Sequence, residues 1–255
     1  MKIGALFCDY DGTLAPLGVP RSDSKIPASL ANVLTRIHKS IPVAIVTAKD
    51  YAFIRRRTPF ADAWSCVYGV ETVVKDGERI VRKPPENISA AVEVVKTMPH
   101  RPSIEYKRTS SGEVCGFGVE WARKKAPEAD VITENISRIS ALGLQVVHHS
   151  LYPMFDVISR SSDKGVAVHD LQRILRIEKG LMFIGDSPAD NPAFALADVG
   201  IGVFGVPGRP ALDCHYFVRN TYLSRFLSAL VENELEFSER MPYIRPRVAP
   251  ARARA

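Results

Sequence analysis

The chain of 255 residues carries a formal net charge of +6, and 46% of its residues are hydrophobic. This length can bury a large core in one or two domains. No apolar run approaches the ~18 residues of a membrane span, and the first apolar run ends at Asp9, so we expect no membrane insertion, no signal peptide and a cytoplasmic location. Four well-separated cysteines without a CxxC pair indicate reduced thiols rather than a disulfide framework or a zinc site.

The positive charge is concentrated at the end of the chain. Residues 240–255 contain five arginines and no acidic residue. Their Pro, Arg and Ala composition predicts an extended or disordered tail. The tail could contact RNA or an acidic surface, but the chain has no helix-turn-helix, RRM or zinc-finger pattern. We therefore favour a solubilising or packing arm and do not expect nucleic acid as a partner; the oligomeric state has no signal in the sequence.

The first apolar run, residues 3–8, has no polar alternation and predicts a strand buried on both faces of a parallel sheet. It leads directly into Asp9 and Asp11, followed by a Gly-Thr pair. Ligands in such folds bind beyond the carboxyl ends of the strands, so these carboxylates lie where chemistry is expected. Their repulsion is relieved by a cation or by a proton on one of them. A calcium loop is excluded because the Gly and Glu that it requires are missing.

Alternating helix and strand patterns continue to residue 83, as in a doubly wound α/β sheet. Helices are predicted over 27–37 and 51–57, strands over 42–46 and 66–68, and a hairpin over 73–81.

Residues 84–160 have a different order, in which the unit helix, strand, strand occurs twice. The helices are predicted over 88–98 and 128–142, and the strands over 104–108, 116–121, 144–149 and 155–159. This order predicts a small antiparallel sheet with two helices on one face. We therefore expect an α+β domain at 84–160, inserted into a discontinuous α/β domain formed by 1–83 and 161–240, with 241–255 as the tail.

The α/β pattern then resumes. Helices are predicted over 165–177, 191–196 and 222–236, and strands over 181–184, 199–203 and 216–218. The glycines of residues 200–205 match a dinucleotide fingerprint by letter, but a Pro- and Gly-rich segment follows in place of a helix. This segment is therefore interpreted as a late strand with a glycine-rich exit. No P-loop is present.

Four segments resemble, in the same order, the motifs of haloacid dehalogenase-like (HAD) phosphatases. They are Asp9-Tyr10-Asp11-Gly12-Thr13-Leu14, Val43-Ala44-Ile45-Val46-Thr47, Asp163-Lys164-Gly165 and Gly185-Asp186-Ser187-Pro188-Ala189-Asp190. The insert between the second and third motifs resembles the C2 cap of subclass IIB. The resemblance, which extends to about residue 235, implies a Rossmann-like parallel-sheet core with a C2B-type cap.

The resemblance also implies roles for the motif residues. Asp9 would be the nucleophile that forms an aspartyl-phosphate, and Asp11 the general acid and base. Mg²⁺, which prefers hard oxygen ligands, would be bound by Asp9, Asp186 and the backbone carbonyl of Asp11, with Asp190 orienting its waters. Phosphate would be held by Thr47 and Lys164. Many Cof-type relatives have Asn where this chain has Ala189, and Asn191 is a candidate to supply the missing amide.

The substrate is not fixed by these motifs. The first motif resembles trehalose-phosphate phosphatases, whereas the fourth resembles mannosyl-phosphoglycerate and archaeal phosphoglycolate phosphatases. Residues 75–125 hold 11 Lys or Arg against 7 Asp or Glu, which fits a substrate with a second acidic group or an ordinary surface. Candidate substrate contacts in the insert are Glu105, Lys107, Arg108, His149 and Tyr152.

We expect a Mg²⁺-dependent phosphatase that hydrolyses a small phosphorylated sugar or sugar acid through an aspartyl-phosphate. A phosphoglycolate phosphatase and a broad-specificity metabolite phosphatase are alternatives within the enzymes. A non-catalytic binding or scaffold protein on the same fold is the alternative outside them.

Overall fold

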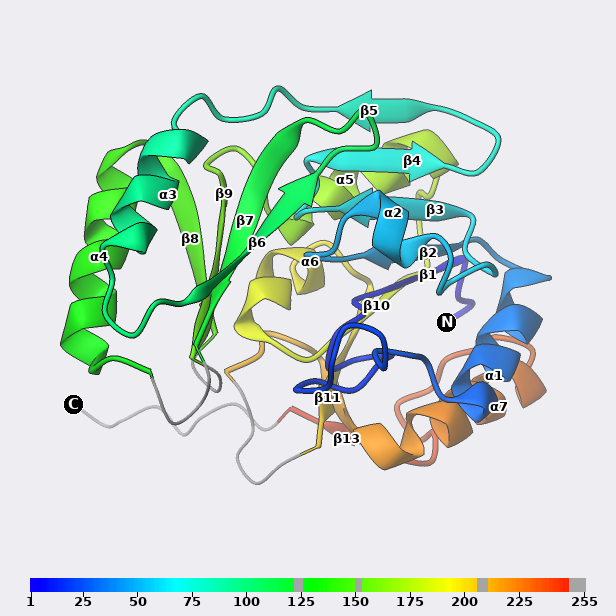
Figure 1. The fold of residues 1–255 in the computed structure, drawn as a ribbon. Helices are drawn as coiled ribbons and strands as arrows, with labels where there is room; N and C mark the ends of the chain where they lie inside the picture. Colours follow the sequence, from blue (N-terminus) through cyan, green and yellow to red (C-terminus); the bar gives the residue numbers. More distant parts are fainter. Residues whose placement is uncertain (122–125, 150–152, 206–210, 248–255) are drawn as a thin grey trace, which may run out of the picture.

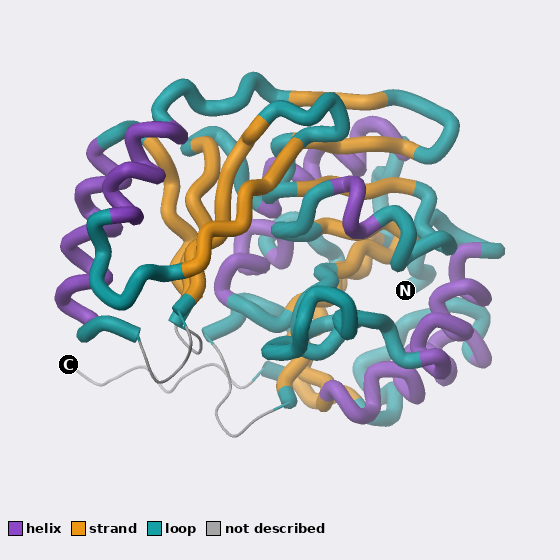
Figure 2. Tube along the Cα trace, viewed as in Figure 1, coloured by secondary structure: helices purple, strands orange, loops and turns teal. Residues whose placement is uncertain are grey.

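The computed structural model describes residues 1–121, 126–149, 153–205 and 211–247. The chain forms a nine-stranded sheet and a separate four-stranded sheet, which lie next to each other in Figure 1. The tube in Figure 2 shows the helices along the outer side of the smaller sheet. Within the described ranges, no helix has the length and apolarity needed to span a bilayer.

The larger sheet is parallel at its centre and antiparallel at both edges. Its strands are β1 Ala5–Cys8, β2 Val43–Val46, β3 Ala63–Cys66, β4 Glu71–Val74, β5 Arg79–Val81, β10 Leu181–Gly185, β11 Val199–Phe204, β12 Tyr216–Arg219 and β13 Ile244–Pro246. They are arranged in the order β13-β12-β11-β10-β1-β2-β3-β4-β5. The six central strands, β12 to β3 in this order, pair in parallel, as the predicted doubly wound fold requires.

Helices cover both faces of this sheet. On one face lie α1 Ala28–His38, α2 Tyr51–Ile54 and α7 Leu223–Glu232, and on the other lie α5 Lys164–Leu175 and α6 Asn191–Phe194. The buried strand β1 serves both layers, because Leu6 and Cys8 pack with the first group and Ala5 and Phe7 with the second. The absence of polar alternation in the sequence of β1 follows from this two-sided burial.

The position of β1 determines where a ligand can bind. It lies between β2, which follows it in the chain, and β10, which comes after the whole insert. The chain order therefore reverses at β1. In open parallel sheets the crevice beyond the carboxyl ends of the strands at such a reversal is the usual ligand site.

The smaller sheet is formed by the doubled unit predicted from the sequence. Its strands are β6 Ser103–Arg108, β7 Val114–Glu120, β8 Leu144–His149 and β9 Met154–Ser159, and its helices are α3 Ile88–Lys96 and α4 Ala129–Ala141. The order is β6-β7-β9-β8, with every pair antiparallel. Phe117 and Phe155 pack against α3 and α4. The alternate residues of β7 and β9 face the larger sheet.

Three predicted elements differ from the structure by three residues or more at one end. The helix predicted over 222–236 is α7, which ends at Glu232. The third strand is predicted at 66–68 but is β3, Ala63–Cys66, because Val67 and Tyr68 adopt positive φ angles of 47° and 56° in a turn. The helix predicted over 51–57 ends at Ile54.

The tail predicted over 241–255 begins as structured chain. Ile244–Pro246 is the edge strand β13, which pairs antiparallel with β12, and the amide of Arg247 donates to the carbonyl of His215. The described part of the tail is therefore a packing arm. Residues 248–255 lie outside the described part of the chain.

Candidate active site

The loop after β1 directs two carboxylates into the crevice. Asp9 is 5% exposed, and its amide donates to the carbonyl of Ile184 on β10, which holds it beside the neighbouring strand. Gly12 turns the chain with a φ of +83°. A Cβ at Gly12 would lie 2.1 Å from Oδ2 of Asp186, so this close approach of two loops requires glycine.

Lys164 is held between two aspartates at the start of α5. Asp163 caps this helix by accepting a hydrogen bond from the amide of Val166 at 2.7 Å. The Lys164 Nζ donates to Oδ1 of Asp9 and to Oδ1 of Asp190, both at 2.6 Å. Burial alone would lower the pKa of Lys164, but the carboxylates of Asp190 and Asp9 raise it above its ordinary value. The ammonium is therefore charged at neutral pH.

Strand β10 brings the second pair of acids into place. After Gly185 the chain forms a 3-10 turn, Pro188–Asp190, in which Oδ2 of Asp190 accepts the amides of Asp186 and Ser187, both at 3.0 Å. Asp190 is fully buried, and both of its oxygens are used. It holds the loop that carries Asp186 in shape.

Asp9, Asp186 and Asp190 form a cluster whose ligand oxygens lie within 4.8 Å of one another. The hydroxyl of Thr13 donates to Asp9 at 3.2 Å and to Asp186 at 3.0 Å. Carboxylate oxygens are the donors that hard divalent cations prefer. Because the oxygens of Asp190 are already engaged, Asp9 and Asp186 are the better ligands of the three, and the cluster fits a divalent metal ion.

The electrostatics of the cluster point the same way. Burial raises the pKa of Asp9 to about 6, even though Lys164 opposes the shift. Burial and the neighbouring carboxylates of Asp9 and Asp190 raise the pKa of Asp186 well above its ordinary value. Carboxylates crowded in this way are disfavoured in the charged form, and a bound cation removes that cost.

Asp11 lies at the edge of the crevice, apart from the cluster. Its Oδ2 is 3.5 Å from the Nζ of Lys49, and Ser24 donates to its Oδ1 at 3.5 Å. Lys49 follows β2 by three residues and lines the same cleft as Asp11. Asp9 and Asp11 are therefore separated by a single residue but have different partners, one buried with Lys164 and the other half-buried with Lys49.

The two further residues predicted to bind phosphate differ in position. Thr47 follows β2 and is fully buried, and its Oγ1 accepts the amide of Lys49 at 3.1 Å. The side chain of Asn191 is turned to another loop, where it donates to Ala211 at 3.1 Å and accepts from the amide of Asp213 at 2.8 Å. Asn191 does not line the cleft, so the structure does not bring it to the phosphate-binding position expected from the sequence.

The cluster opens into a cleft of about 500 Å³ between the two sheets. Three of the five candidates from the insert line it, namely Glu105, Lys107 and His149. Arg108 does not, because its guanidinium donates to the carbonyl of Gly112 within the β6–β7 turn. Tyr152 lies outside the described residues.

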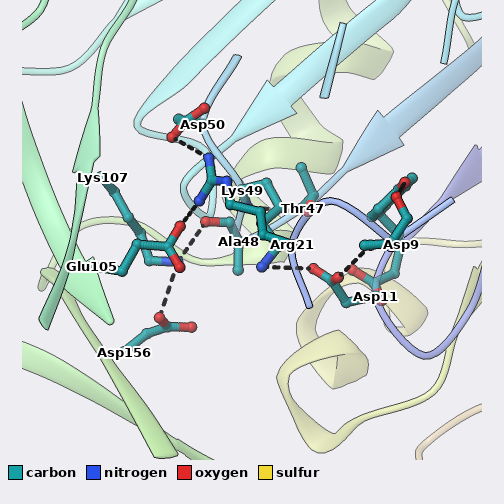
Figure 3. Close-up of polar contacts among 12 residues, drawn as sticks. Asp9, Asp11, Arg21, Thr47, Ala48, Lys49, Asp50, Glu105, Lys107 and Asp156 are labelled. Atoms are coloured by element: carbon teal, nitrogen blue, oxygen red, sulfur yellow. Dashed lines mark hydrogen bonds and ion pairs between the residues drawn. The ribbon is translucent and has the colours of Figure 1, made fainter. Parts of the chain in front are cut away.

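A buried polar hub joins the smaller sheet to the larger one at the cleft. The Nζ of Lys107 lies 3.0 Å from Oδ1 of Asp156 and donates to the carbonyl of Ala48 at 2.9 Å (Figure 3). Tyr68 donates to Oδ2 of Asp156 at 2.7 Å, and His149 lies 3.4 Å from the same oxygen. Burial would raise the pKa of Asp156, but Lys107, His149 and Tyr68 together hold it below its ordinary range.

Arg21 makes a second contact across the cleft. Its guanidinium forms ion pairs with Glu105 of β6 and with Asp50 at the start of α2 (Figure 3). A third contact lies beside β4, where the buried carboxylate of Glu71 accepts from the amide and hydroxyl of Ser110. The smaller sheet is thus fixed to the core by three sets of polar contacts.

Sequence reasoning missed several residues of this site. Thr13 lies inside the first motif, and its place beside Asp9 was a usable signal. Asp156 is a charged residue in an otherwise apolar strand, which signals a buried ion pair. Lys49 and Tyr68 carried no signal, because their partners are distant in sequence.

No family model matches the chain, and no curated protein matches it. Solved structures do. A HAD subclass IIB sugar phosphatase is 18% identical with a TM-score of 0.67, covering 91% of this chain and 100% of its own. A trehalose-6-phosphate phosphatase related protein is 17% identical with a TM-score of 0.66, covering 91% and 99%. The C-terminal domain of C. albicans trehalose-6-phosphate phosphatase is 14% identical with a TM-score of 0.71, covering 91% and 93%.

These structures match nearly all of the chain and nearly all of their own lengths. The chain has the fold of the HAD phosphatases of subclass IIB.

Proposed function

We propose that this protein is a Mg²⁺-dependent phosphatase that hydrolyses a small phosphorylated sugar or sugar-acid monoester through an aspartyl-phosphate. The observation that carries the proposal is the position of Asp9. Its carboxylate is buried at the end of the central strand, and Lys164 and Thr13 hold it at the inner end of the cleft. A carboxylate held in one orientation beside an ammonium suits attack on a phosphoryl group.

In the first step, a carboxylate oxygen of Asp9 attacks phosphorus, and the bond from phosphorus to the ester oxygen breaks. Asp11 donates a proton to the departing oxygen. Its half-buried place at the cleft edge supports this role, because the leaving group must point toward the cleft.

In the second step, the carboxylate of Asp11 takes a proton from water as the water attacks the aspartyl-phosphate. The bond between phosphorus and Asp9 breaks, inorganic phosphate leaves, and Asp9 is regenerated. Lys164 remains hydrogen-bonded to Asp9 and offsets the negative charge of the phosphoryl oxygens. The hydroxyl of Thr47, which follows the adjacent strand, would be a further donor for these oxygens, but it is fully buried and does not line the cleft.

Asp9, Asp186 and the carbonyl of Asp11 would hold the cation, with Asp190 fixing the loop. When bound, Mg²⁺ supplies positive charge that favours ionised Asp9 and offsets the charge developing on the phosphoryl group. Oxygen ligands and room for water favour Mg²⁺ over softer metals.

The smaller sheet and its helices, within residues 84–160, would act as the substrate-specificity cap on a core of 1–83 and 161–240. The support for this division is the position of the cleft, which takes its catalytic residues from the larger sheet and its opposite wall from β6, β7, β8 and β9. Glu105, Lys107 and His149 would then face the leaving group, and Arg108 would not.

Phosphate release tests the proposal. The wild-type chain with Mg²⁺ should hydrolyse p-nitrophenyl phosphate and at least one sugar phosphate, and EDTA should stop the reaction. Asp9→Asn should abolish turnover, while the control Asp76→Asn, an exposed residue of the β4–β5 turn, should keep it. Full activity of Asp9→Asn in a preparation free of contaminating phosphatase would refute the mechanism.

A panel of sugar phosphates, phosphoglycolate and nucleotides separates the remaining alternatives. A strong preference for one sugar phosphate supports the proposal. A preference for phosphoglycolate would show that the protein is a phosphoglycolate phosphatase instead. Similar rates on many compounds would indicate a broad-specificity phosphatase. Absence of turnover on the whole panel would favour a binding protein on this fold.

A further inference from the structure

The cleft lining has more acidic than basic side chains, whereas residues 75–125 of the sequence have more basic than acidic ones. The lining includes six carboxylates, Asp9, Asp11, Glu105, Glu120, Asp156 and Asp186, and four Lys or Arg side chains, Arg21, Lys49, Lys107 and Lys164. Among the described residues, the excess of basic residues over 75–125 is therefore not matched by an excess of cations in the cleft.

Each of the four cations already has an acidic partner. Arg21 pairs with Glu105, Lys49 with Asp11 and Lys107 with Asp156. Lys164 pairs with Asp9 and Asp190. A second acidic group on a substrate would thus meet no unpaired Lys or Arg among the described residues of the cleft.

Glu120 is the exception among the acids. Outside the aspartate cluster, it is the cleft carboxylate that has no ion pair and no side-chain hydrogen bond within the described residues. It is exposed, at the end of β7, and the hydroxyl of Ser103 donates to its backbone carbonyl rather than to its carboxylate.

The strand register places Glu120 on the wall of the cleft. It is paired with Ser103 of β6 and with Met154 of β9, and all three residues line the cleft. The next position on the same face of β7 is Gly118, which has no side chain to cover the surface. Because the neighbouring position on this face is a glycine, the Glu120 carboxylate is left accessible to a ligand.

One stretch of the cleft lining is apolar. It is formed by residues 16–20, where Leu17 and Val19 are each 38% exposed. A leaving group in this cleft would meet both the unpaired carboxylate of Glu120 and these apolar side chains. A polyol ring presents hydroxyl donors and C–H groups in this way, whereas a second anion does not.

We propose that Glu120 is a specificity residue that accepts hydrogen bonds from hydroxyl groups of the leaving group and rejects leaving groups with a carboxylate or a second phosphate. The inference rests on the proposed function and narrows its substrate to a neutral or cationic sugar monophosphate. Ionised carboxylates accept strong hydrogen bonds and repel like charge, so one residue supplies both effects.

Three compounds with the same carbon skeleton test this proposal, namely glucose 6-phosphate, glucosamine 6-phosphate and 6-phosphogluconate. Their dissociation constants are measured by calorimetry with Mg²⁺ on the full chain carrying Asp9→Asn, in which turnover is stopped. We expect 6-phosphogluconate to bind more weakly than the other two. Adding Glu120→Gln should reduce the ratio of the 6-phosphogluconate dissociation constant to the other two about fivefold, which is the effect of one exposed like-charge contact. Glu120→Lys should make 6-phosphogluconate the tightest-binding compound of the three.

Glu134→Gln is the matched control, because it removes an exposed acid from α4 on the far face of the smaller sheet. It should leave the gap unchanged. An unchanged gap in Glu120→Gln, tighter binding of 6-phosphogluconate to the parent, or no binding of any of the three compounds would overturn the proposal. Phosphate release by the wild type is measured separately, so a phosphatase with unaltered discrimination in Glu120→Gln is distinguished from a chain with no phosphatase activity.

Discussion

Replacing Asp156 by Asn should destabilise the protein more than any other single isosteric change at the junction of the two sheets. Asp156 is 2% exposed, and Lys107, 3.0 Å away, is 5% exposed. Asn keeps the shape and one acceptor but leaves the ammonium without its counter-charge. Breaking a buried ion pair costs about 3–5 kcal/mol. Because Lys107 keeps its hydrogen bond to Ala48, we expect the lower end, about 3 kcal/mol.

A double-mutant cycle isolates the pair. Lys107→Met alone leaves the carboxylate of Asp156 with Tyr68 and His149, and should cost a similar amount. In the double variant neither charge is left unpaired, so its cost should fall short of the sum of the singles by at least about 1.5 kcal/mol. Urea unfolding at pH 7, followed by the fluorescence of Trp64 in β3 and Trp121 after β7, reports on both sheets.

Tyr68→Phe is the control within the same hub. It removes one hydrogen bond to Asp156 without unpairing a charge, so it should cost only about 1 kcal/mol. A cost below about 1 kcal/mol for Asp156→Asn, or additivity of Lys107→Met and Asp156→Asn to within about 0.5 kcal/mol, would show that the buried pair does not join the sheets.

Three further predictions follow from the contacts described above. Because the folded pKa of Asp156 is depressed, the stabilisation from its carboxylate is complete above the unfolded pKa of about 3.9 and is lost as pH falls through the folded pKa. The difference in unfolding free energy between wild type and Asp156→Asn should therefore be constant from pH 5 to 8 and shrink below about pH 4. A difference that grows in acid contradicts this prediction. Gly12→Ala should destroy phosphate release and lower stability by about 1–2 kcal/mol, since its Cβ overlaps Asp186 at a φ of +83°; normal turnover would disprove the overlap. Lys49→Met should lower kcat/KM about tenfold through loss of its pair with Asp11, and an unchanged kcat/KM would exclude that contact from the reaction.

The elements that the sequence predicts well are those whose burial is decided locally. Strand β1 has four consecutive buried residues, and its unbroken apolar run indicates this without knowledge of its neighbours. The doubled helix-strand-strand unit likewise predicts the antiparallel sheet of four strands, because its apolar periodicity changes at each element. The third strand is predicted too late, since Tyr68 has strand propensity but leaves the strand to hydrogen-bond with Asp156.

The residues of the candidate site likewise fall into those that a local pattern predicts and those that it does not. Asp9, Asp186, Asp190 and Lys164 follow strand ends or begin a helix, and parallel strands bring such positions together at one edge of the sheet. Asn191 is only one residue beyond Asp190, yet its amide is bound by the segment around Ala211 and Asp213, which no local pattern connects to it. Neighbouring residues in the sequence therefore share a site only where the backbone directs both side chains into it.

Charge is the property for which composition misleads most. Residues 75–125 carry 11 basic and 7 acidic side chains, which fits either a substrate with a second acidic group or an ordinary surface. In the structure, Lys107 is neutralised by Asp156 from another strand, and Arg108 donates to its own turn. The field that a ligand meets is set by the charges left over after pairing. Among the described cleft residues outside the aspartate cluster, the carboxylate left over is that of Glu120. If Glu120 selects against acidic leaving groups as proposed, the substrate preference is opposite in sign to the one that local net charge suggests.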